Sequence, residues 1–261
     1  KGFISSATLR DGFAGIWVEE ADGLSFRYNN LAGGQYGMYL RGDTDNHAIE
    51  RNNVFGAAVY GIRLTDNGGP AASGSTIASN LFYSNLIGLV EQGGRTNQIR
   101  LNTANANRQY GIYNYRSQDS LVESNTAEKN RYGGFIAEES SSMTVRTNAA
   151  RYNVLYGYVL NKATGSLWTS NTSERNGLWG VYSLDSSSNV LQANVISSNT
   201  DSGIWLLRGA YNHLQANTAD SHGNNVIILL DTSSNTLLAN TVYGNFDGLY
   251  VAQSSYNYLG S

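Results

Sequence analysis

The chain has 261 residues, of which 14% are charged, and its formal net charge is -3. This charge argues against a nucleic-acid partner, which would need a basic face. There is no cysteine, which excludes disulfide frameworks and thiolate metal sites. The longest clean apolar run, Val226 to Leu230, is far shorter than the ~20 residues of a membrane-spanning helix, so no membrane span is expected.

From the N-terminus onward, asparagines recur at a nearly constant spacing, which indicates an internal repeat. The column begins with Asn30, Asn53 and Asn80 and continues with Asn102, Asn125, Asn148, Asn171, Asn194, Asn217 and Asn240. From Asn102 onward every step has the same length. The step from Asn53 to Asn80 is the longest, because it holds residues 67–74, which include the only proline. This segment predicts a loop insertion within one coil.

Two further columns accompany the first. One comprises Asn85, Asn107, Asn130, Asn153, Asn176, Asn199, His222 and Asn245, and the other includes Asn97, Asn189, Asn212 and Asn235. Asparagine tolerates the left-handed backbone conformation, so we expect these residues to turn the chain in every coil. Stacked amides can also bond to those above and below them. The asparagines are therefore interpreted as scaffold.

Between the turns, apolar residues alternate with a period of two, as in strands. One inward column is Ile112, Phe135, Tyr158, Val181, Ile204 and Ile227, and another is Ile99, Val122, Val145, Trp168, Leu191, Leu214 and Leu237. Such coils can stack as strands about 4.8 Å apart. The sequence predicts an all-β fold, a single-stranded right-handed parallel β-helix of about eleven coils, over residues 1–261 as one domain. Because the sequence begins at Lys1 without a visible signal peptide, we expect it to be part of a longer parent chain.

Three phrases carry a family resemblance: Asn148 to Asn153, Tyr110 to Tyr113, and Ser187 to Asn194. They resemble the parallel β-helix repeats of NosD-type proteins and of carbohydrate-binding and sugar-hydrolase domains. The resemblance covers nearly the whole chain and implies the fold. It leaves the activity open, because lyases, hydrolases, epimerases, phage tailspikes and adhesins share this fold.

Charged residues also recur with the repeat. Opposite charges alternate along three columns: Arg116, Glu139, Lys162, Asp185, Arg208 and Asp231; Arg100, Glu123 and Arg146; and Glu128, Arg151 and Glu174. In stacked coils each charge would lie over an opposite one, and a slip of one coil would bring like charges together. These columns are expected to specify register and not to form an active site.

Known enzyme motifs of this fold are missing. The Asp-Pro-His-Asp motif of epimerases and the Arg-x-Pro-x-x-Arg motif of pectate lyases cannot occur, because the only proline, Pro70, lies between Gly69 and Ala71. Glu138 and Glu139 are adjacent and should point to opposite faces of a strand, which does not suit the two facing carboxylates of glycosidases. No catalytic residue is assigned.

Acidic residues and histidines are the candidate metal ligands of this sequence. Glu19, Glu20 and Asp22, together with Asp43 and Asp45, sit at corresponding turns of adjacent coils and could gather oxygens for Ca²⁺, although the ligand set is incomplete. The three histidines, His47, His213 and His222, lie on different coils. We therefore assign no metal site and no cofactor.

An outward column between the inward ones is the best functional candidate. It reads Trp17, Tyr39, Arg63, Val90, Tyr113, Ile136, Val159, Tyr182, Trp205, Ile228 and Tyr250. The candidate ligand-binding or interface residues are Trp17, Tyr39, Tyr113, Tyr115, Tyr182, Trp205, Ile228 and Tyr250. Tyr and Trp rings could stack on sugars. Toward the C-terminus, between Val159 and Leu230, the face is more apolar and could be covered by another subunit or by a further segment of the parent polypeptide.

Two hypotheses follow from these features. The first is a non-catalytic extracellular or cell-surface module, with the periplasm as an alternative location, that binds polysaccharide or builds a surface assembly. The second is a polysaccharide lyase, glycoside hydrolase or uronate epimerase whose site the sequence does not reveal. Because solenoid ends expose strand edges and core, we also expect end-to-end or side-by-side association, or a flanking domain that covers an end.

Overall fold

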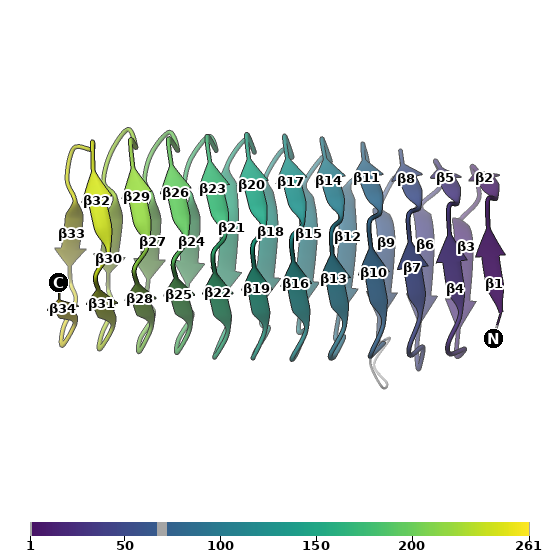
Figure 1. Ribbon diagram of the computed structural model, residues 1–261, viewed down its shortest axis with the longest axis horizontal. Coiled ribbons are helices and arrows are strands. Elements are labelled where there is room, and N and C mark those ends of the chain that lie inside the picture. The colour runs from purple at the N-terminus through teal and green to yellow at the C-terminus, as the bar shows by residue number, and fades with distance from the viewer. Residues whose placement is uncertain (1, 67–71, 261) are drawn as a thin grey trace.

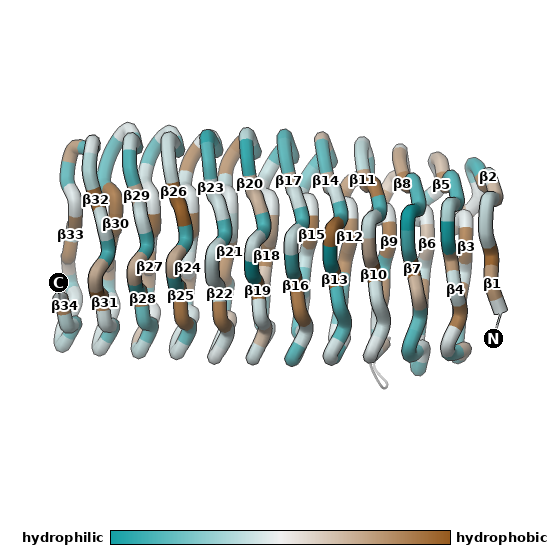
Figure 2. Tube along the Cα trace, viewed as in Figure 1, coloured by the Kyte–Doolittle hydropathy of each residue, from teal (hydrophilic) through white to brown (hydrophobic). Residues whose placement is uncertain are grey.

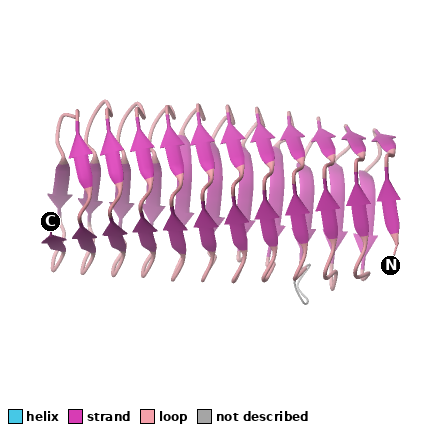
Figure 3. Ribbon diagram, in the orientation of Figure 1, coloured by secondary structure: helices cyan, strands magenta, loops and turns pink. Residues whose placement is uncertain are grey.

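The computed structural model describes residues 2–66 and 72–260, which form a parallel β-helix (Figure 1). Each coil adds one strand to each of three parallel sheets, and the described residues include no helix (Figure 3). No described segment therefore forms a helix that is long and apolar enough to cross a membrane. The β-helix of about eleven coils predicted from the sequence repeat is confirmed.

The three sheets are called A, B and C. Sheet A contains β1 (Phe3–Ser5), β4 (Ser25–Arg27), β7 (Ala48–Glu50), β10 (Thr76–Ala78), β13 (Gln98–Arg100), β16 (Leu121–Glu123), β19 (Thr144–Arg146), β22 (Leu167–Thr169), β25 (Val190–Gln192), β28 (His213–Gln215), β31 (Thr236–Leu238) and β34 (Tyr258–Gly260). Sheet B contains β2 (Thr8–Arg10), β5 (Asn30–Ala32), β8 (Asn53–Phe55), β11 (Leu81–Tyr83), β14 (Thr103–Asn105), β17 (Thr126–Glu128), β20 (Ala149–Arg151), β23 (Thr172–Glu174), β26 (Val195–Ser197), β29 (Thr218–Asp220) and β32 (Thr241–Tyr243). Sheet C contains β3 (Ala14–Glu19), β6 (Tyr36–Arg41), β9 (Tyr60–Thr65), β12 (Ile87–Gln92), β15 (Tyr110–Tyr115), β18 (Gly133–Glu138), β21 (Tyr156–Asn161), β24 (Val181–Leu184), β27 (Ile204–Leu207), β30 (Ile227–Leu230) and β33 (Leu249–Ala252).

The coils stay in register across the predicted insertion. Ile49 on β7 pairs directly with Ile77 on β10, although the stretch of chain between them is longer than in the other coils. The extra residues therefore lie between β9 and β10, outside the ladders. Of the predicted insertion 67–74, residues 67–71 fall outside the described part of the chain.

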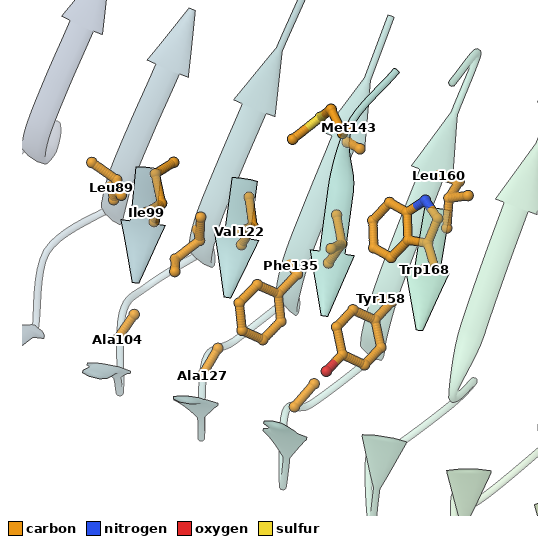
Figure 4. Packing of buried hydrophobic residues seen from close by; sticks show 14 of the residues in the cluster. Leu89, Ile99, Ala104, Val122, Ala127, Phe135, Met143, Tyr158, Leu160 and Trp168 are labelled. Carbon is orange, nitrogen blue, oxygen red and sulfur yellow. The ribbon is translucent and has the colours of Figure 1, made fainter. Parts of the chain in front are cut away.

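The core runs along the whole axis between the sheets. Figure 2 shows apolar residues recurring at similar positions in successive coils. The inward columns are buried as predicted, including Trp168, which is 3% exposed. Phe135 stacks on Tyr158 with ring centroids 5.1 Å apart, and Tyr158 meets Trp168 edge-on at 6.0 Å (Figure 4). The Tyr158 hydroxyl donates to the Asn148 carbonyl at 2.8 Å, so its polar end is satisfied in the core.

The asparagine columns form continuous hydrogen-bonded ladders. In a representative step, the backbone N–H and the Nδ2 of Asn102 both donate to Oδ1 of Asn125, at 2.9 and 3.0 Å. The same Nδ2 also donates to the Ile77 carbonyl at 2.8 Å. Each buried amide therefore finds partners in the coils on both sides. The stacking prediction is confirmed from Asn80 onward. For the first two coils it was wrong by one position, because Asn29 and Asn52, and not Asn30 and Asn53, continue the ladder to Asn80.

The backbone prediction for these asparagines was wrong. Positive φ occurs at the residue before each ladder asparagine, as at Leu101 (56°), Ser124 (54°) and Thr147 (54°), and not at Asn102, Asn125 or Asn148. The reason is geometric, since the amide must point into the solenoid to reach the next coil. The preceding residue, whose side chain is free to point outward, makes the turn.

The charge ladders are formed in large part. Arg116 bonds Glu139 at 2.8 Å, and Lys162 lies 3.9 Å from the other Glu139 oxygen. Arg208 bonds Asp185 at 2.8 Å. In the shorter columns, ion pairs join Arg146 to Glu123 at 2.7 Å, and Arg151 to Glu128 and Glu174 at 4.0 and 3.4 Å. Most of these charges are thus neutralised by the neighbouring coil and are not gathered into a site.

The two ends of the described solenoid expose residues that would otherwise belong to the core. In the last coil, Val242, Leu249, Val251 and Leu259 occupy inward columns and are 36–52% exposed. At the other end, Ile4 pairs with the buried Phe26 and is 40% exposed. The expected association through the ends remains a prediction.

Candidate functional site

The outward column predicted from the sequence lies on the outer face of sheet C. Backbone pairing runs without interruption from Trp17 to Tyr250 through every member of the column. Tyr115 lies two positions beyond Tyr113 on the same strand, β15. The predicted candidates therefore share one face, and their function as a site stays a prediction.

These residues differ in accessibility. Trp17 and Tyr250 are 43% and 46% exposed, and the Tyr113, Tyr115, Tyr182 and Trp205 side chains are half-buried. Tyr39 and Ile228, by contrast, are buried, at 9% and 7% exposure. Ile228 can therefore contribute little contact area to a ligand. Tyr250 lies on the last coil, two coils beyond Trp205.

Aromatic residues that the sequence analysis did not single out complete this surface. They are Phe13, Tyr36, Tyr60, Tyr110, Tyr132, Tyr156 and Trp179, and each has its ring next to another ring on the same side of sheet C. Most of them stand immediately before a glycine at the start of a sheet C strand, as in Tyr110-Gly111, Tyr156-Gly157 and Trp179-Gly180. This aromatic-glycine pair, repeated with the coil, is the sequence signal that could have revealed them.

The glycine after most of these rings is required by close packing of the coils, as at Gly111. A Cβ at Gly111 would lie 2.8 Å from the Gly134 carbonyl oxygen and 2.8 Å from the Ala127 Cβ. Neither approach is possible for a real side chain. The backbone there lies against the next coil, and the preceding ring is left on the outer face.

Toward the N-terminus the surface combines rings with arginine. Tyr36 stacks on Tyr39 with centroids 4.8 Å apart, and Trp17 meets Tyr39 edge-on at 4.7 Å. The Arg63 guanidinium lies 5.4 Å from the ring centroids of both Tyr39 and Tyr60, within cation–π range. Arg63 Nη2 also donates to Gln92 Oε1 at 2.7 Å, which extends the polar edge to the next coil.

The central part of the surface is more polar. The Tyr113 hydroxyl donates to Glu138 Oε2 at 2.6 Å. Burial, with the hydrogen bond to the Glu138 carboxylate, raises the pKa of Tyr113 well above its usual value, so the phenol stays protonated. Tyr115 lies 4.8 Å from the Arg116 guanidinium, and Arg116 itself is paired with Glu139. Glu138 and Glu139 therefore have separate partners and do not form a facing carboxylate pair.

Four rings gather toward the C-terminus: Tyr156, Trp179, Tyr182 and Trp205. Trp179 is at their centre, with its centroid 5.3 Å from Tyr156, 4.6 Å from Tyr182 and 4.3 Å from Trp205. Its Nε1 donates to Asp201 Oδ2 at 2.7 Å, which fixes the indole. Burial raises the pKa of Tyr182, consistent with rings that shield one another. Leu184, Leu207 and Leu230, two positions further along, are half-buried and form the apolar flank predicted there.

The acidic residues proposed for Ca²⁺ serve the coil ladders. Asp22 Oδ1 accepts the Asp45 N–H at 2.8 Å, and Asp45 Oδ1 accepts the Ser73 N–H at 2.7 Å. Glu19 lies 3.5 Å from Arg41. Within residues 2–66 and 72–260, no group of three His, Cys, Asp or Glu side chains is placed to hold a metal ion.

Comparisons with known proteins agree with the fold. Residues 103–259 match the family described as periplasmic copper-binding protein (NosD), and residues 14–172 match the right handed beta helix region. None of the curated proteins compared with the chain matches it.

Several solved structures share the fold. The periplasmic alginate epimerase AlgG superimposes with a TM-score of 0.79 at 15% identity, covering 97% of this chain and 72% of that one. The alginate lyase from Paenibacillus gives a TM-score of 0.65 at 10% identity, with 92% and 99% covered. The Dettilon tailspike protein gives 0.63 at 14% identity, with 97% and 54% covered. At these identities the similarity shows the fold alone.

The residues of this chain do not fit a copper site of the kind named in the family description. Soft or imidazole ligands would be needed, yet cysteine is absent from the sequence. Met38 and Met143 are buried in the core. The Nδ1 atoms of His47 and His222 accept backbone N–H groups of Leu24 and Asn199, and the two rings sit on distant coils.

Proposed function

The chain belongs to the NosD-type family of right-handed β-helix proteins, and we propose that it is an extracellular or periplasmic module that binds polysaccharide on the outer face of sheet C without transforming it. One observation carries this proposal: aromatic rings recur along that face from Trp17 on β3 to Trp205 on β27. Rings of this kind offer apolar faces to sugars, and the Tyr and Trp polar edges can bond hydroxyls.

The fold supports the binding of an extended ligand. Coils spaced about 4.8 Å apart place rings at fixed intervals along the axis. The asparagine ladders hold these intervals rigidly, which lowers the entropic cost of binding. Structural neighbours that are named for epimerisation or lysis of alginate make polysaccharide the natural ligand class to test.

The test is a panel of alginate and neutral polysaccharides, reading both binding and product formation. We expect binding without product. Tyr182→Ala/Trp205→Ala should weaken binding at least tenfold, since the stacking of two rings on the sugar is lost. The matched control is Phe55→Ala/Tyr83→Ala, which removes a stacked ring pair, 4.9 Å apart, from sheet B. If the wild-type protein binds no polymer of the panel, the proposal is wrong.

A second candidate function is a polysaccharide-active enzyme, and the Tyr113–Glu138 hydrogen bond favours it. A protonated phenol beside a carboxylate on an exposed face could take part in proton transfer to a bound sugar. Product formation in the same panel would support this function in place of simple binding.

Self-association through the apolar flank is the third possibility, favoured by Leu184, Leu207 and Leu230 beside Trp205. It predicts that Tyr182→Ala/Trp205→Ala changes the oligomeric state in size-exclusion chromatography and leaves sugar affinity unchanged. The same variant therefore separates assembly from glycan binding.

A further inference from the structure

Pairs of aromatic rings recur on sheet C with a regular spacing. The first pair is Tyr36 and Tyr39 on β6, with centroids 4.8 Å apart. The second is Tyr110 and Tyr113 on β15, 5.9 Å apart. The third is Trp179, two residues before β24, and Tyr182 on β24, 4.6 Å apart. In each pair the second residue stands three positions after the first, so all three are built in the same way.

The register separates these pairs by equal steps. Tyr39 is connected to Tyr113 through Arg63 and Val90, which makes three coil steps. Tyr113 is connected to Tyr182 through Ile136 and Val159, again three steps. At ~4.8 Å per step, neighbouring pairs are about 14 Å apart and the outer pairs about 29 Å apart.

The coils between the pairs do not repeat this arrangement. The two equivalent positions hold Tyr60 and Arg63 on β9, and Tyr156 and Val159 on β21, so each of these coils carries a single ring there. On β12 they hold Ile87 and Val90, and on β18 Gly133 and Ile136. Two-ring platforms at this position are thus confined to every third coil from β6 to β24.

The intervals hold polar groups beside the single rings of Tyr60, Tyr132 and Tyr156. Between the first and second pairs lie Arg63 and Gln92, which bond each other at 2.7 Å. Between the second and third lie Glu138 and Asn161, which are paired across β18 and β21. Ring platforms separated by hydrogen-bonding groups suit a chain of sugars better than an apolar protein surface, because the intervals can bond hydroxyls.

We propose that the three ring pairs are subsites that hold one extended polysaccharide chain parallel to the solenoid axis, the first of them through the Tyr36 ring, because Tyr39 is only 9% exposed. This inference rests on the proposed function and adds the orientation and length of the ligand. A chain that reaches a second or third pair binds there intramolecularly, at a high effective concentration. The affinity for an oligosaccharide should therefore rise in steps as the oligosaccharide becomes long enough to reach a second and then a third ring pair.

The experiment measures Kd by calorimetry for size-fractionated alginate oligosaccharides, or for oligosaccharides of whichever polymer in the panel binds. For the wild-type protein we expect at least tenfold tighter binding once the extended oligosaccharide exceeds ~14 Å, and a second gain of similar size beyond ~29 Å. Trp179→Leu/Tyr182→Leu should keep the first gain and lose the second. Tyr110→Leu/Tyr113→Leu should lose the first and keep a single gain near ~29 Å.

Leucine preserves apolar packing, and unchanged melting curves would confirm that the variants fold. If a leucine variant is destabilised, the wild-type length series still decides the question. Phe55→Leu/Tyr83→Leu on sheet B is the control and should reproduce the wild-type steps. A wild-type protein that binds the polymer but binds short and long oligosaccharides equally well would overturn the inference and leave the proposed function standing. Binding of no polymer at all would overturn both.

Discussion

The ring of His222 takes the place of an asparagine, and its Nδ1 accepts the backbone N–H of Asn199 at 3.2 Å. The Gly203 position, where a Cβ would lie 2.7 Å from Nε2, leaves room for the ring. His47 does the same in another ladder, accepting the Leu24 N–H at 3.1 Å. In both rings Nε2 is buried, and Nδ1, which accepts an N–H, cannot carry a proton. Both histidines must therefore be neutral to complete their ladders.

Acid should loosen these two coils. Burial lowers the pKa of both rings below 6.5, although Asp22 and Asp45 near His47, and Asp220 near His222, oppose the shift. The unfolded chain therefore takes up protons at a higher pH than the folded one, so stability is complete above about pH 6.5 and falls below it. The expected loss is up to about 1.4 kcal/mol per pH unit for each ring, until its folded-state pKa is reached.

Urea unfolding midpoints between pH 8 and pH 5 test this dependence. His47→Asn/His222→Asn restores the ladder residue and should flatten the profile in that range. An identical slope in the variant would show that the two rings are not the acid-sensitive groups.

The Glu139 carboxylate joins two coils at once, because it pairs with Arg116 and lies near Lys162. The hydrogen bond from Arg116 lowers the pKa of Glu139. Glu139→Lys would place three positive charges in succession, so melting should fall by a few degrees at low salt. The effect should vanish near 1 M salt, where the Debye length is about 3 Å. Arg116→Glu/Glu139→Lys restores one opposite pair and should recover part of the loss. Unchanged low-salt melting of Glu139→Lys would show that the ladder contributes nothing.

The Glu91 carboxylate forms a buried hydrogen-bond network within the apolar core. The side chain is 0% exposed and faces inward between Leu64 and Asn114. Its oxygens accept hydrogen bonds from Asn97 Nδ2 at 2.6 Å, Ser120 Oγ at 2.8 Å and Asn114 Nδ2 at 2.5 Å. Glu91→Leu would remove the acceptor that these three buried groups share. The Asn114 amide would lose its partner, and Asn97 and Ser120 would keep only their bonds to the Ala72 and Gln118 carbonyls, so the change should cost about 2–4 kcal/mol of unfolding free energy.

Glu91→Gln is the matched control. Because the Asn114 amide can rotate to present its oxygen, glutamine can replace most of the bonds and should cost at most ~1 kcal/mol. Chemical denaturation of both variants measures the difference. Equal stability of wild type and Glu91→Leu would mean that the network is dispensable.

The fold could be predicted because every coil places the same residue types at the same points. Ile99, Val122, Val145 and Trp168 define an inward column that the structure reproduces residue by residue. Asn102 and its equivalents mark the turns just as clearly, although the strained conformation belongs to the residue before each of them. The repeat spacing shows where each turn lies in the sequence. It does not show which residue of the turn adopts the left-handed conformation, because that depends on contacts between coils.

The candidate surface was only half predictable for a related reason. A period of two identifies Tyr113 and Tyr182 as outward, but it assigns no face to Tyr110 or Trp179, which precede a glycine at the start of their strands. The close approach of Gly111 to the next coil leaves the preceding ring outside, and that approach is a tertiary contact. Glu91 was missed because every other residue of its column is uncharged. A buried carboxylate there depends on donors from Asn97 and Ser120, which lie beyond its own strand.

The hydrogen bond between Tyr113 and Glu138 distinguishes binding from catalysis. Tyr113→Phe removes the hydroxyl and keeps the ring of the central pair. If the surface only binds glycans, glycan affinity should change by less than about threefold. The variant loses only the hydrogen bond from Tyr113 to Glu138, which lies within the protein, and the ring face that stacks on the sugar remains. If the pair transfers a proton, product formation should fall by about 10²-fold or more while binding persists. Glu138→Gln provides the complementary test, because it keeps a hydrogen-bond acceptor for Tyr113 but removes the base. Calorimetry and product analysis on the same two variants therefore give opposite patterns for the two functions. A loss of affinity in Tyr113→Phe, without any product from the wild-type protein, would contradict both functions. It would mean that the ligand contacts the Tyr113 hydroxyl, which the structure shows bonded to Glu138.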